Sequence, residues 1–223
     1  MPSAKINLNK KDAESFSNSN KVDFESSNEF VTAWSDNYFL KTKNIIRNFG
    51  DIKVTYAVFM RRPVLFTPKL MVNWLEKMAA KRNTKFSFEF NYKEGEWVGA
   101  GEPLLYISGS FFHLVDLETI YLQKLGAACV AAYNAYTMCI DLPNTSFLAM
   151  DCRHCAGTEM ADIMAYAASV GSNAARKHTN AKGFVGNAVA LGFVETGMLL
   201  KLSKQIQDSI LSSIPMKRWA KPS

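Results

Sequence analysis

The longest apolar segment of the sequence runs from Phe111 to Leu142 and repeats with the period of an α-helix. Its middle, Gly126–Ala132, consists almost entirely of small residues, and Pro143 follows the segment. Because proline cannot continue a helix, we predict one long helix that ends before Pro143. The apolar stripe of this helix is formed by Leu114, Leu117, Tyr121, Leu125, Ala128 and Ala132. A face of small residues lets another element approach closely, so we expect the helix to be packed on several sides.

Helices and strands alternate in the sequence before this segment. Thr67 is a candidate N-cap and Pro68 suits the first position of the helix that follows it. The apolar spacing predicts helices over Asn28–Phe49, with a break at Ser35 or Asp36, and over Leu70–Arg82, and strands over Lys53–Met60, Phe86–Phe90 and Leu104–Ile107. These elements indicate an α+β layer in the first part of the chain.

A strand–helix–strand pattern follows Pro143. We predict a short, fully buried strand over Phe147–Met150, a helix that Thr158 caps and that continues to Lys177, and a second buried strand over Gly183–Gly186. An amphipathic helix is expected after Gly197. This order is typical of a parallel β–α–β unit, and the sequence therefore predicts an α/β fold class.

Composition shifts along the chain suggest four regions. Residues 1–27 are rich in Asn, Ser and Lys, and we expect a disordered arm there. Residues 28–142 form the predicted N-terminal α/β sandwich with its long connecting helix, residues 143–188 open a second domain, and residues 189–223 carry a helix and a basic tail. A length of 223 residues allows one large domain or two small ones.

The charge and hydropathy of the chain exclude some classes of protein. No apolar run approaches the roughly 18 residues that span a bilayer, and the N-terminus lacks the apolar core of a secretory signal. We therefore expect a cytoplasmic protein without a membrane partner. The net charge is +6, and residues 201–223 carry five basic residues and one acidic residue. Such a terminal cluster is more often a solvated tail than a nucleic-acid site, so we do not expect nucleic acid as a partner.

Cys152 and Cys155 form a C-x-x-C pair. This spacing is found in metal sites and in redox pairs. A zinc site needs two further ligands, however, and His113 and His178 are distant in the sequence. We favour two unrelated thiols, and the role of the pair stays open.

The segment Met150–Thr158 is the most suggestive for function, because ionisable residues follow directly on a predicted buried strand and precede a helix. In α/β folds, ligands bind at this carboxyl end of a strand. Arg153 can bind a carboxylate or phosphate through two parallel hydrogen bonds. His154 can act as a hydrogen-bond donor or as an acid–base group. The alternative is a structural ion pair of Arg153 with Asp151 or Glu159.

Two other segments are less specific. His113 and Asp116 share one helical face near the start of the long apolar segment. A structural role and a functional role are about equally favoured for them. The glycine-rich stretch Glu94–Leu105 lacks the spacing of a phosphate-binding loop, so we interpret its glycines as turn residues.

The sequence resembles the nicotinate phosphoribosyltransferase family from about Val31 to Ala188. The stretches that carry the resemblance, in order along the chain, are Ser35–Thr42, Gly101–Leu105, Leu117–Leu125, the segment around Arg153, and Gly183–Ala188. Each stretch is modest alone, but five in the same order are specific.

The resemblance implies an N-terminal α/β sandwich followed by an irregular type II phosphoribosyltransferase α/β barrel, in a protein that works as a dimer. It implies that nicotinate and phosphoribosyl pyrophosphate are joined into nicotinate mononucleotide for NAD biosynthesis, with coupled ATP hydrolysis and with Mg²⁺ on the pyrophosphate. By resemblance, Tyr38 reaches the pyridine site of the partner subunit and Arg153 contacts substrate. His154 stands where many members carry another basic residue.

The chain departs from the family in two ways. Met150-Asp151-Cys152 stands where many members have Asp-Phe-Gly, whose Phe stacks on the pyridine ring. The likeness also ends at Ala188, whereas family members are about twice as long as this chain, beyond the usual range of one domain. We therefore expect an incomplete barrel, and either a homodimer or a partner chain that completes it.

Two other functions stay open at this point. One is a non-catalytic remnant or interaction subunit that keeps the N-terminal sandwich, and the other is a metal or redox module built on Cys152 and Cys155.

Overall fold

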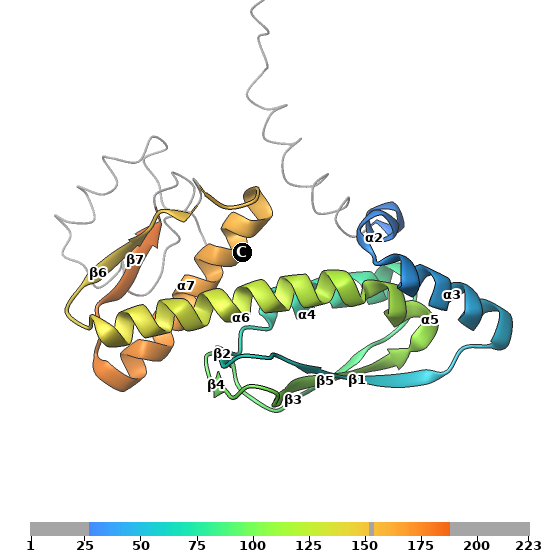
Figure 1. Cartoon of the computed structure of the whole chain (residues 1–223), viewed down its shortest axis with the longest axis horizontal. Coiled ribbons are helices and arrows are strands. Elements are labelled where there is room, and N and C mark those ends of the chain that lie inside the picture. Colours follow the sequence, from blue (N-terminus) through green and yellow to red (C-terminus); the bar gives the residue numbers. More distant parts are fainter. Residues whose placement is uncertain (1–26, 152–153, 188–223) are drawn as a thin grey trace, which may run out of the picture. The chain divides into compact units, whose positions relative to one another are not determined.

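The computed structural model describes residues 27–151 and 154–187, and within them the chain has a mixed α/β fold (Figure 1). The predicted arm over residues 1–27 lies almost wholly outside the described residues, and the helix expected after Gly197 lies wholly outside them. None of the described helices combines the length and the apolar character that a membrane span needs.

The described elements follow the predicted order of helices and strands. They are α2 (Asn28–Trp34), α3 (Asn37–Phe49), β1 (Lys53–Phe59), β2 (Val64–Leu65), α4 (Lys69–Lys81), β3 (Ser87–Phe90), β4 (Trp97–Val98), β5 (Pro103–Ser110), α5 (Phe111–Leu114), η1 (Val115–Leu117), α6 (Glu118–Asp141), β6 (Ser146–Ala149), α7 (Thr158–Thr179) and β7 (Gly183–Asn187). Most bounds lie within one or two residues of the predicted ones. The two-residue strands β2 and β4 are too short to show a period and were not predicted.

The described strands form three sheets. One has the strand order β1-β5-β3, β2 pairs antiparallel with β4, and β6 pairs parallel with β7. The parallel pair confirms the β–α–β unit that was predicted after Pro143. Its register joins Phe147 to Phe184 and Ala149 to Asn187, with an irregularity between Phe147 and Leu148.

The chain divides into two compact units, each built from three separate segments. The first contains residues up to Tyr56, then Met71–Phe88 and Ile107–Gln123, and the second contains Ala57–Leu70, Glu89–Tyr106 and the residues from Lys124 onward. The predicted domain boundary between residues 142 and 143 stays a prediction.

The first unit has a small apolar core next to a buried ion pair. The core consists of Phe39, Ile46 and Val115, with the rings of Phe111 and Phe112 packed against it. The break between α2 and α3 at Ser35 and Asp36 is confirmed, and α3 ends at Gly50, whose φ of 103° suits glycine.

The long helix predicted from Phe111 is interrupted near its start. After the four residues of α5 the backbone tightens into a 3₁₀ turn over Val115–Leu117, and α6 begins at Glu118. Asp116 lies in this turn, and Arg82 and Lys43 bind its carboxylate. We attribute the interruption to this attachment, because it fixes the turn to α3, which contains Lys43, and to Arg82, which directly follows α4.

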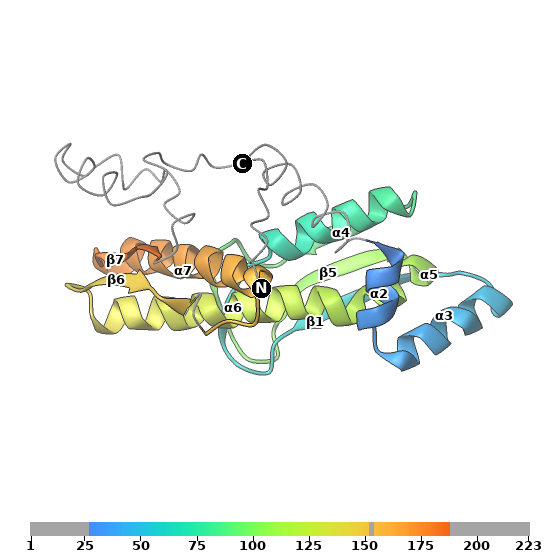
Figure 2. The same ribbon diagram turned by 90° about the horizontal axis from the view of Figure 1, so that it is seen from above.

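The small face of α6 is where α7 packs closely, as the sequence predicts. An ideal Cβ on Gly171 of α7 would lie 2.2 Å from the carbonyl oxygen of Ala132 and 2.9 Å from the Cβ of Ala135. The α7 ribbon crosses that of α6 obliquely in Figure 1, and the two helices run alongside each other in Figure 2. The core of the second unit continues from this contact through Leu65, Ala132, Ala167, Val170 and Ala174.

Three predictions about the strand–helix–strand unit are wrong. The first is the burial of β7, in which Val185 is 40% exposed and Phe184 is only half-buried. β6 is not fully buried, because Ser146 and Leu148 are exposed and alternate with half-buried Phe147 and Ala149. The N-cap of α7 is Gly157, with φ 90°, rather than Thr158. Gly157 adopts a backbone conformation that a threonine would not favour.

Candidate functional site

The carboxyl end of β6 is the candidate functional site of the second unit. β6 ends at Ala149, and the carbonyl oxygen of Asp151 then accepts hydrogen bonds from the backbone N–H groups of His154, at 2.8 Å, and Cys155, at 2.9 Å. A tight turn therefore follows the strand and leads into α7. This places the Met150–Thr158 segment at the strand end where the sequence predicts ligand binding.

Asp151 offers a carboxylate oxygen at this strand end. Its Oδ2 atom is buried, and among the described residues it has no hydrogen-bond partner. A buried carboxylate oxygen without a partner is costly, so a ligand or cation that binds it would stabilise the site. Mg²⁺ is usually held by one or two carboxylates together with substrate phosphates. Asp151 therefore fits the Mg²⁺ that the family resemblance implies.

The predicted substrate residues at this strand end are described in part. His154 is exposed and lies in this turn. Arg153 and Cys152 lie outside the described residues, so the contact of Arg153 with substrate stays a prediction and the role of Cys152 and Cys155 stays open. The alternative pairing of Arg153 with Glu159 competes with another cation, because Lys124 of α6 forms an ion pair with Glu159.

The ion pair of Lys124 and Glu159 holds the first turn of α7 against α6. The Lys124 side chain is almost fully buried, whereas that of Glu159 is about two-fifths exposed. A buried ammonium needs such a partner, since an unpaired charge in the interior is strongly unfavourable. This pair fixes the start of α7, and with it the turn that carries Asp151 and His154.

α7 also fixes the start of β7. The Ser172 hydroxyl is buried and accepts a hydrogen bond from the Phe184 N–H at 3.0 Å. Arg176 donates to the carbonyl oxygens of Ala181, Lys182 and Phe184. The parallel register of β6 and β7 is therefore held by polar contacts as well as by apolar packing.

Tyr38 is the predicted substrate residue of the first unit. It lies in the first turn of α3, its side chain is 59% exposed, and its ring centroid lies 4.0 Å from that of buried Phe39. Partial desolvation raises the pKa of Tyr38, and the negative charges of Asp36 and Glu118 raise it further. The phenol stays protonated near neutral pH and presents an aromatic face to solvent, as a platform for a flat ring requires.

Glu118, at the start of α6, interacts electrostatically with the phenols of Tyr38 and Tyr56. Burial raises the pKa of the Glu118 carboxyl, and the charge of Asp36 adds to this effect. Burial likewise raises the pKa of Tyr56 to about 12, with a further contribution from Glu118. The rings of Tyr56 and Tyr121 meet edge to face at 6.4 Å between centroids. The surroundings of Tyr38 are therefore aromatic and acidic.

Tyr38 and His154 belong to different compact units, and each is described within its own unit. Their shared role in substrate binding therefore stays a prediction.

The sequence left open whether His113 and Asp116 have a structural or a functional role, and the structure favours the structural one. Asp116 is 3% exposed, and Arg82 binds both of its carboxylate oxygens, at 2.6 and 3.0 Å. Lys43 adds a contact at 2.5 Å. Burial lowers the pKa of His113, and the positive charges of Arg82 and Lys43 lower it further, so its imidazole is neutral near pH 7.

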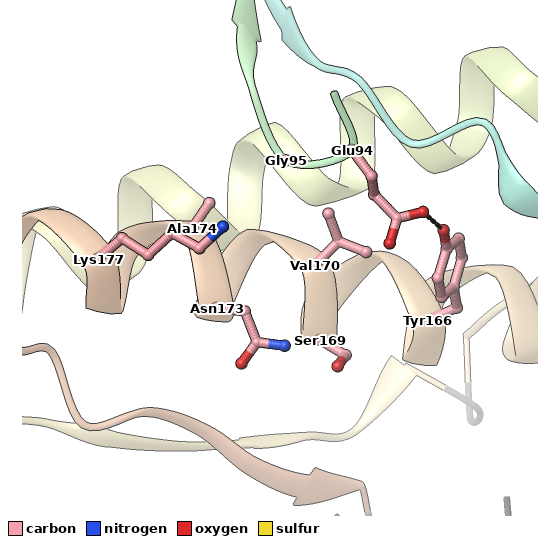
Figure 3. A pocket seen from close by; sticks show the side chains of 8 residues that line it. All are labelled: Glu94, Gly95, Tyr166, Ser169, Val170, Asn173, Ala174 and Lys177. Atoms are coloured by element: carbon pink, nitrogen blue, oxygen red, sulfur yellow. Dashed lines mark hydrogen bonds between the residues drawn. The ribbon is translucent and has the colours of Figure 1, made fainter. Parts of the chain in front are cut away.

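A cavity of about 490 Å³ lies between α7 and the turn before β4 (Figure 3). Its lining residues are Glu94, Gly95, Tyr166, Ser169, Val170, Asn173, Ala174 and Lys177. Glu94 accepts a hydrogen bond from the Tyr166 hydroxyl, which closes one end of the cavity. Burial raises the pKa of Tyr166, and the bond to Glu94 raises it further. Of the predicted substrate residues that the structure describes, neither Tyr38 nor His154 is among its lining residues.

The described cysteines do not support a metal or redox site. Cys129 and Cys139 are buried free thiols, and burial raises the pKa of Cys129 to about 12, which makes it unreactive. Cys155 is a free, half-buried thiol. Among the described residues, no group of three or more His, Cys, Asp or Glu side chains is arranged to hold a metal.

Sequence reasoning missed the partnerships of several polar residues. The pairs Asp36–Thr119, Lys124–Glu159 and Arg82–Asp116 join residues at least 34 positions apart. Charge and hydroxyl content alone did not reveal them. A charged side chain in the interior usually indicates such a pair, but the topology must be known before one can tell which side chains are buried.

Two solved structures share this fold over most of the chain. The structure of nicotinate-nucleotide pyrophosphorylase from Pyrococcus furiosus matches with a TM-score of 0.55 and 21% sequence identity, over 74% of this chain and 40% of that one. Human nicotinic acid phosphoribosyltransferase matches with a TM-score of 0.53 and 18% identity, over 71% of this chain and 36% of that one. At these identities the likeness establishes a shared fold.

The chain spans at most about two-fifths of the length of these two structures. No protein-family model matches the sequence, and no curated protein matches it.

Proposed function

We propose that the chain is a nicotinate phosphoribosyltransferase, or contributes the N-terminal part of one. In this reaction the ring nitrogen of nicotinate bonds to C1 of the phosphoribosyl group, and the bond to pyrophosphate breaks with its electron pair leaving on the pyrophosphate. The observation that carries the proposal is the Asp151–His154 segment at the carboxyl end of β6, in a parallel β–α–β unit. The shared fold with two enzymes of pyridine nucleotide chemistry supports it.

The chemistry of the candidate residues suits this reaction. Nicotinate and pyrophosphate are anions, and Arg153 is the cationic candidate for them, with His154 as a second hydrogen-bond donor. Asp151 offers one carboxylate oxygen to Mg²⁺, which supplies charge neutralisation on the pyrophosphate when it is bound. Tyr38 offers an aromatic face for the pyridine ring. The use of ATP remains part of the proposal, based on the sequence resemblance.

Exposed apolar surface supports an oligomer or a partner chain. In the first unit Trp34, Tyr38, Ile45 and Phe49 are exposed on α2 and α3, and in the second unit Leu148 and Val185 are exposed on the β6–β7 pair. Single exposed apolar residues are common, but clusters of them mark interaction sites. We propose that the chain works as a homodimer or with a chain that completes its barrel, in the cytoplasm.

The test of this function is an assay of the purified chain with nicotinate, phosphoribosyl pyrophosphate and Mg²⁺, with and without ATP. Formation of nicotinate mononucleotide is expected, and nicotinamide and quinolinate as alternative substrates test which ring is used. Arg153→Ala is expected to reduce kcat/KM about a hundredfold or more, because one charge-assisted contact to the reacting groups is lost. Turnover that Arg153→Ala leaves unchanged contradicts the proposed site.

A non-catalytic interaction subunit is the second candidate function, and the exposed apolar residues of β6 and β7 favour it. If the chain alone shows no turnover, affinity purification should recover a second protein that supplies further barrel strands. Activity that returns when this protein is added favours an enzyme of two chains. Binding without activity favours the interaction subunit.

A further inference from the structure

Asp36 begins α3 without capping it. An Asp at the N-cap normally accepts a hydrogen bond from an N–H group in the first turn of its helix. In α3 no such side-chain bond forms, although Asp36 occupies the N-cap position. The carboxylate is bound elsewhere, since its Oδ2 accepts a hydrogen bond from the hydroxyl of Thr119 at 3.0 Å. A local helix-stabilising contact has therefore been replaced by a contact with a residue 83 positions away.

The contact between the two residues is reciprocal. The Thr119 hydroxyl donates to Asp36 and also accepts a hydrogen bond from the Asp36 backbone N–H at 3.1 Å. A second bond lies alongside, because the Ser35 hydroxyl donates to the carbonyl oxygen of Asp116 at 2.7 Å. The first residues of α3 are thus attached to the start of α6 through both side chain and backbone.

This attachment adds little to the stability of the unit. Both hydrogen bonds between Asp36 and Thr119 are solvent-exposed, and exposed polar contacts contribute little to folding. The buried ion pair of Arg82 with Asp116 already holds the neighbouring helices together. A role in stability therefore does not explain why Asp36 gives up its capping bond.

The attachment does fix the position of Tyr38. Tyr38 follows Asp36 by two residues in the first turn of α3, and its ring projects into solvent beside the ring of Phe39. A shift of the helix start would move this exposed ring directly. We propose that Asp36 and Thr119 are positioning residues that hold the Tyr38 ring in the orientation in which it meets the pyridine ring of the substrate. The proposal rests on the function proposed above for Tyr38.

The orientation of Tyr38 is measured by ¹⁹F NMR, with 3-fluorotyrosine placed at position 38 alone. Thr119→Val removes the hydroxyl with little change in shape, and Thr119→Ser keeps it. We expect Thr119→Val to shift or broaden the fluorine resonance and Thr119→Ser to restore it. Thr55→Val is the matched control, because it breaks an exposed hydrogen bond to Ser108 in the same unit without touching α3.

Asp36→Ala provides an independent test if Thr119→Val folds poorly. It removes the same bond without removing a helix cap, and it should perturb the resonance in the same way. A resonance that stays at its wild-type position and width in both Thr119→Val and Asp36→Ala overturns the proposal, whether or not the protein is active.

Titration of the same proteins with nicotinate separates this proposal from the proposed function. We expect Tyr38→Ala, which removes one binding contact, and Thr119→Val, which misplaces it, each to weaken nicotinate affinity about tenfold. Thr119→Ser should bind nicotinate about as tightly as wild type. If Tyr38→Ala leaves the affinity unchanged, the proposed substrate role of Tyr38 is wrong. If Tyr38→Ala weakens binding and Thr119→Val does not, the positioning proposal is wrong.

Discussion

Gly171 of α7 lies so close to Ala132 of α6 that a Cβ atom at position 171 would be 2.2 Å from the Ala132 carbonyl oxygen. The neighbouring atoms include the Tyr136 backbone nitrogen, 2.8 Å from the same point, so the obstruction is backbone and cannot rotate away. The two helices would have to separate to accept any side chain there. We therefore predict that Gly171→Ala destabilises the protein by at least about 2 kcal/mol.

Gly126→Ala is the matched control for this prediction. Gly126 lies in α6, where a new Cβ would meet the Met60 Cε at an ordinary distance of 3.8 Å. Alanine has a higher helix propensity than glycine, so this variant should be as stable as wild type or more stable by up to about 1 kcal/mol. Chemical denaturation of both variants measures the difference. Equal stability of Gly171→Ala and wild type would show that α6 and α7 are not in close contact.

Asp116→Asn tests the buried ion pair of the first unit. The substitution leaves the Arg82 guanidinium, whose side chain is 5% exposed, without its counter-charge. Breaking a buried pair from one side typically costs about 3–5 kcal/mol. The exposed Asp162→Asn on α7 is the control and should change the stability by less than about 0.5 kcal/mol. Urea denaturation monitored by circular dichroism compares the two variants.

The same pair predicts a dependence of stability on pH. Burial alone would raise the pKa of Asp116, but the hydrogen bonds and charges of Arg82 and Lys43 lower it below its ordinary value. A carboxyl whose pKa is lowered by folding stabilises the protein above its unfolded pKa of about 3.9, and this stabilisation is lost as the pH falls through the folded pKa. Between pH 5 and pH 3, wild type should therefore lose more stability than Asp116→Asn. Parallel losses in the two proteins would mean that Asp116 does not contribute to acid unfolding.

Ser172→Ala tests how β7 is held. The substitution removes the acceptor for the Phe184 N–H, and an unsatisfied buried amide costs about 1–3 kcal/mol. Hydrogen exchange of the peptide that contains Phe184 should become faster in this variant. Ser169→Ala, one turn earlier on α7 at the cavity in Figure 3, is the control and should leave this exchange unchanged.

The sequence predicted those parts of the fold that depend on neighbouring residues. Pro143 and Gly50 mark the ends of helices because their backbone chemistry acts locally. The small face of α6 predicted a close neighbour, although not that the neighbour is Gly171 of α7. Packing partners of this kind depend on the topology, which the spacing of apolar residues does not specify.

The candidate site was predictable to a smaller extent. The position of Asp151 and His154 after a strand followed from the local pattern and is confirmed. The interruption of the long helix at Asp116 was not predictable, because Arg82 and Lys43, which bind the Asp116 carboxylate, lie far from it in the sequence. The burial of β6 was overestimated, since an apolar run of four residues does not reveal which face is covered.

Self-association through α3 is the last prediction. Ile45 is 56% exposed and Phe49 is 87% exposed on this helix, and the function proposed for Tyr38 requires a partner subunit beside it. Light scattering after size exclusion should therefore give a mass above that of the 24.9 kDa monomer. The double variant Ile45→Ser, Phe49→Ser should shift the protein towards the monomer, because it removes apolar surface that association would bury.

Leu142→Ser is the control, because Leu142 is about as exposed as Ile45 but belongs to the second unit. It should leave the mass unchanged if α3 provides the interface. A shift to monomer in Leu142→Ser alone would instead place the interface in the second unit, and Tyr38 would then lack the partner site that its proposed role requires. If the wild-type protein is monomeric and still turns over nicotinate, the reaction does not need the Tyr38 ring of a second subunit.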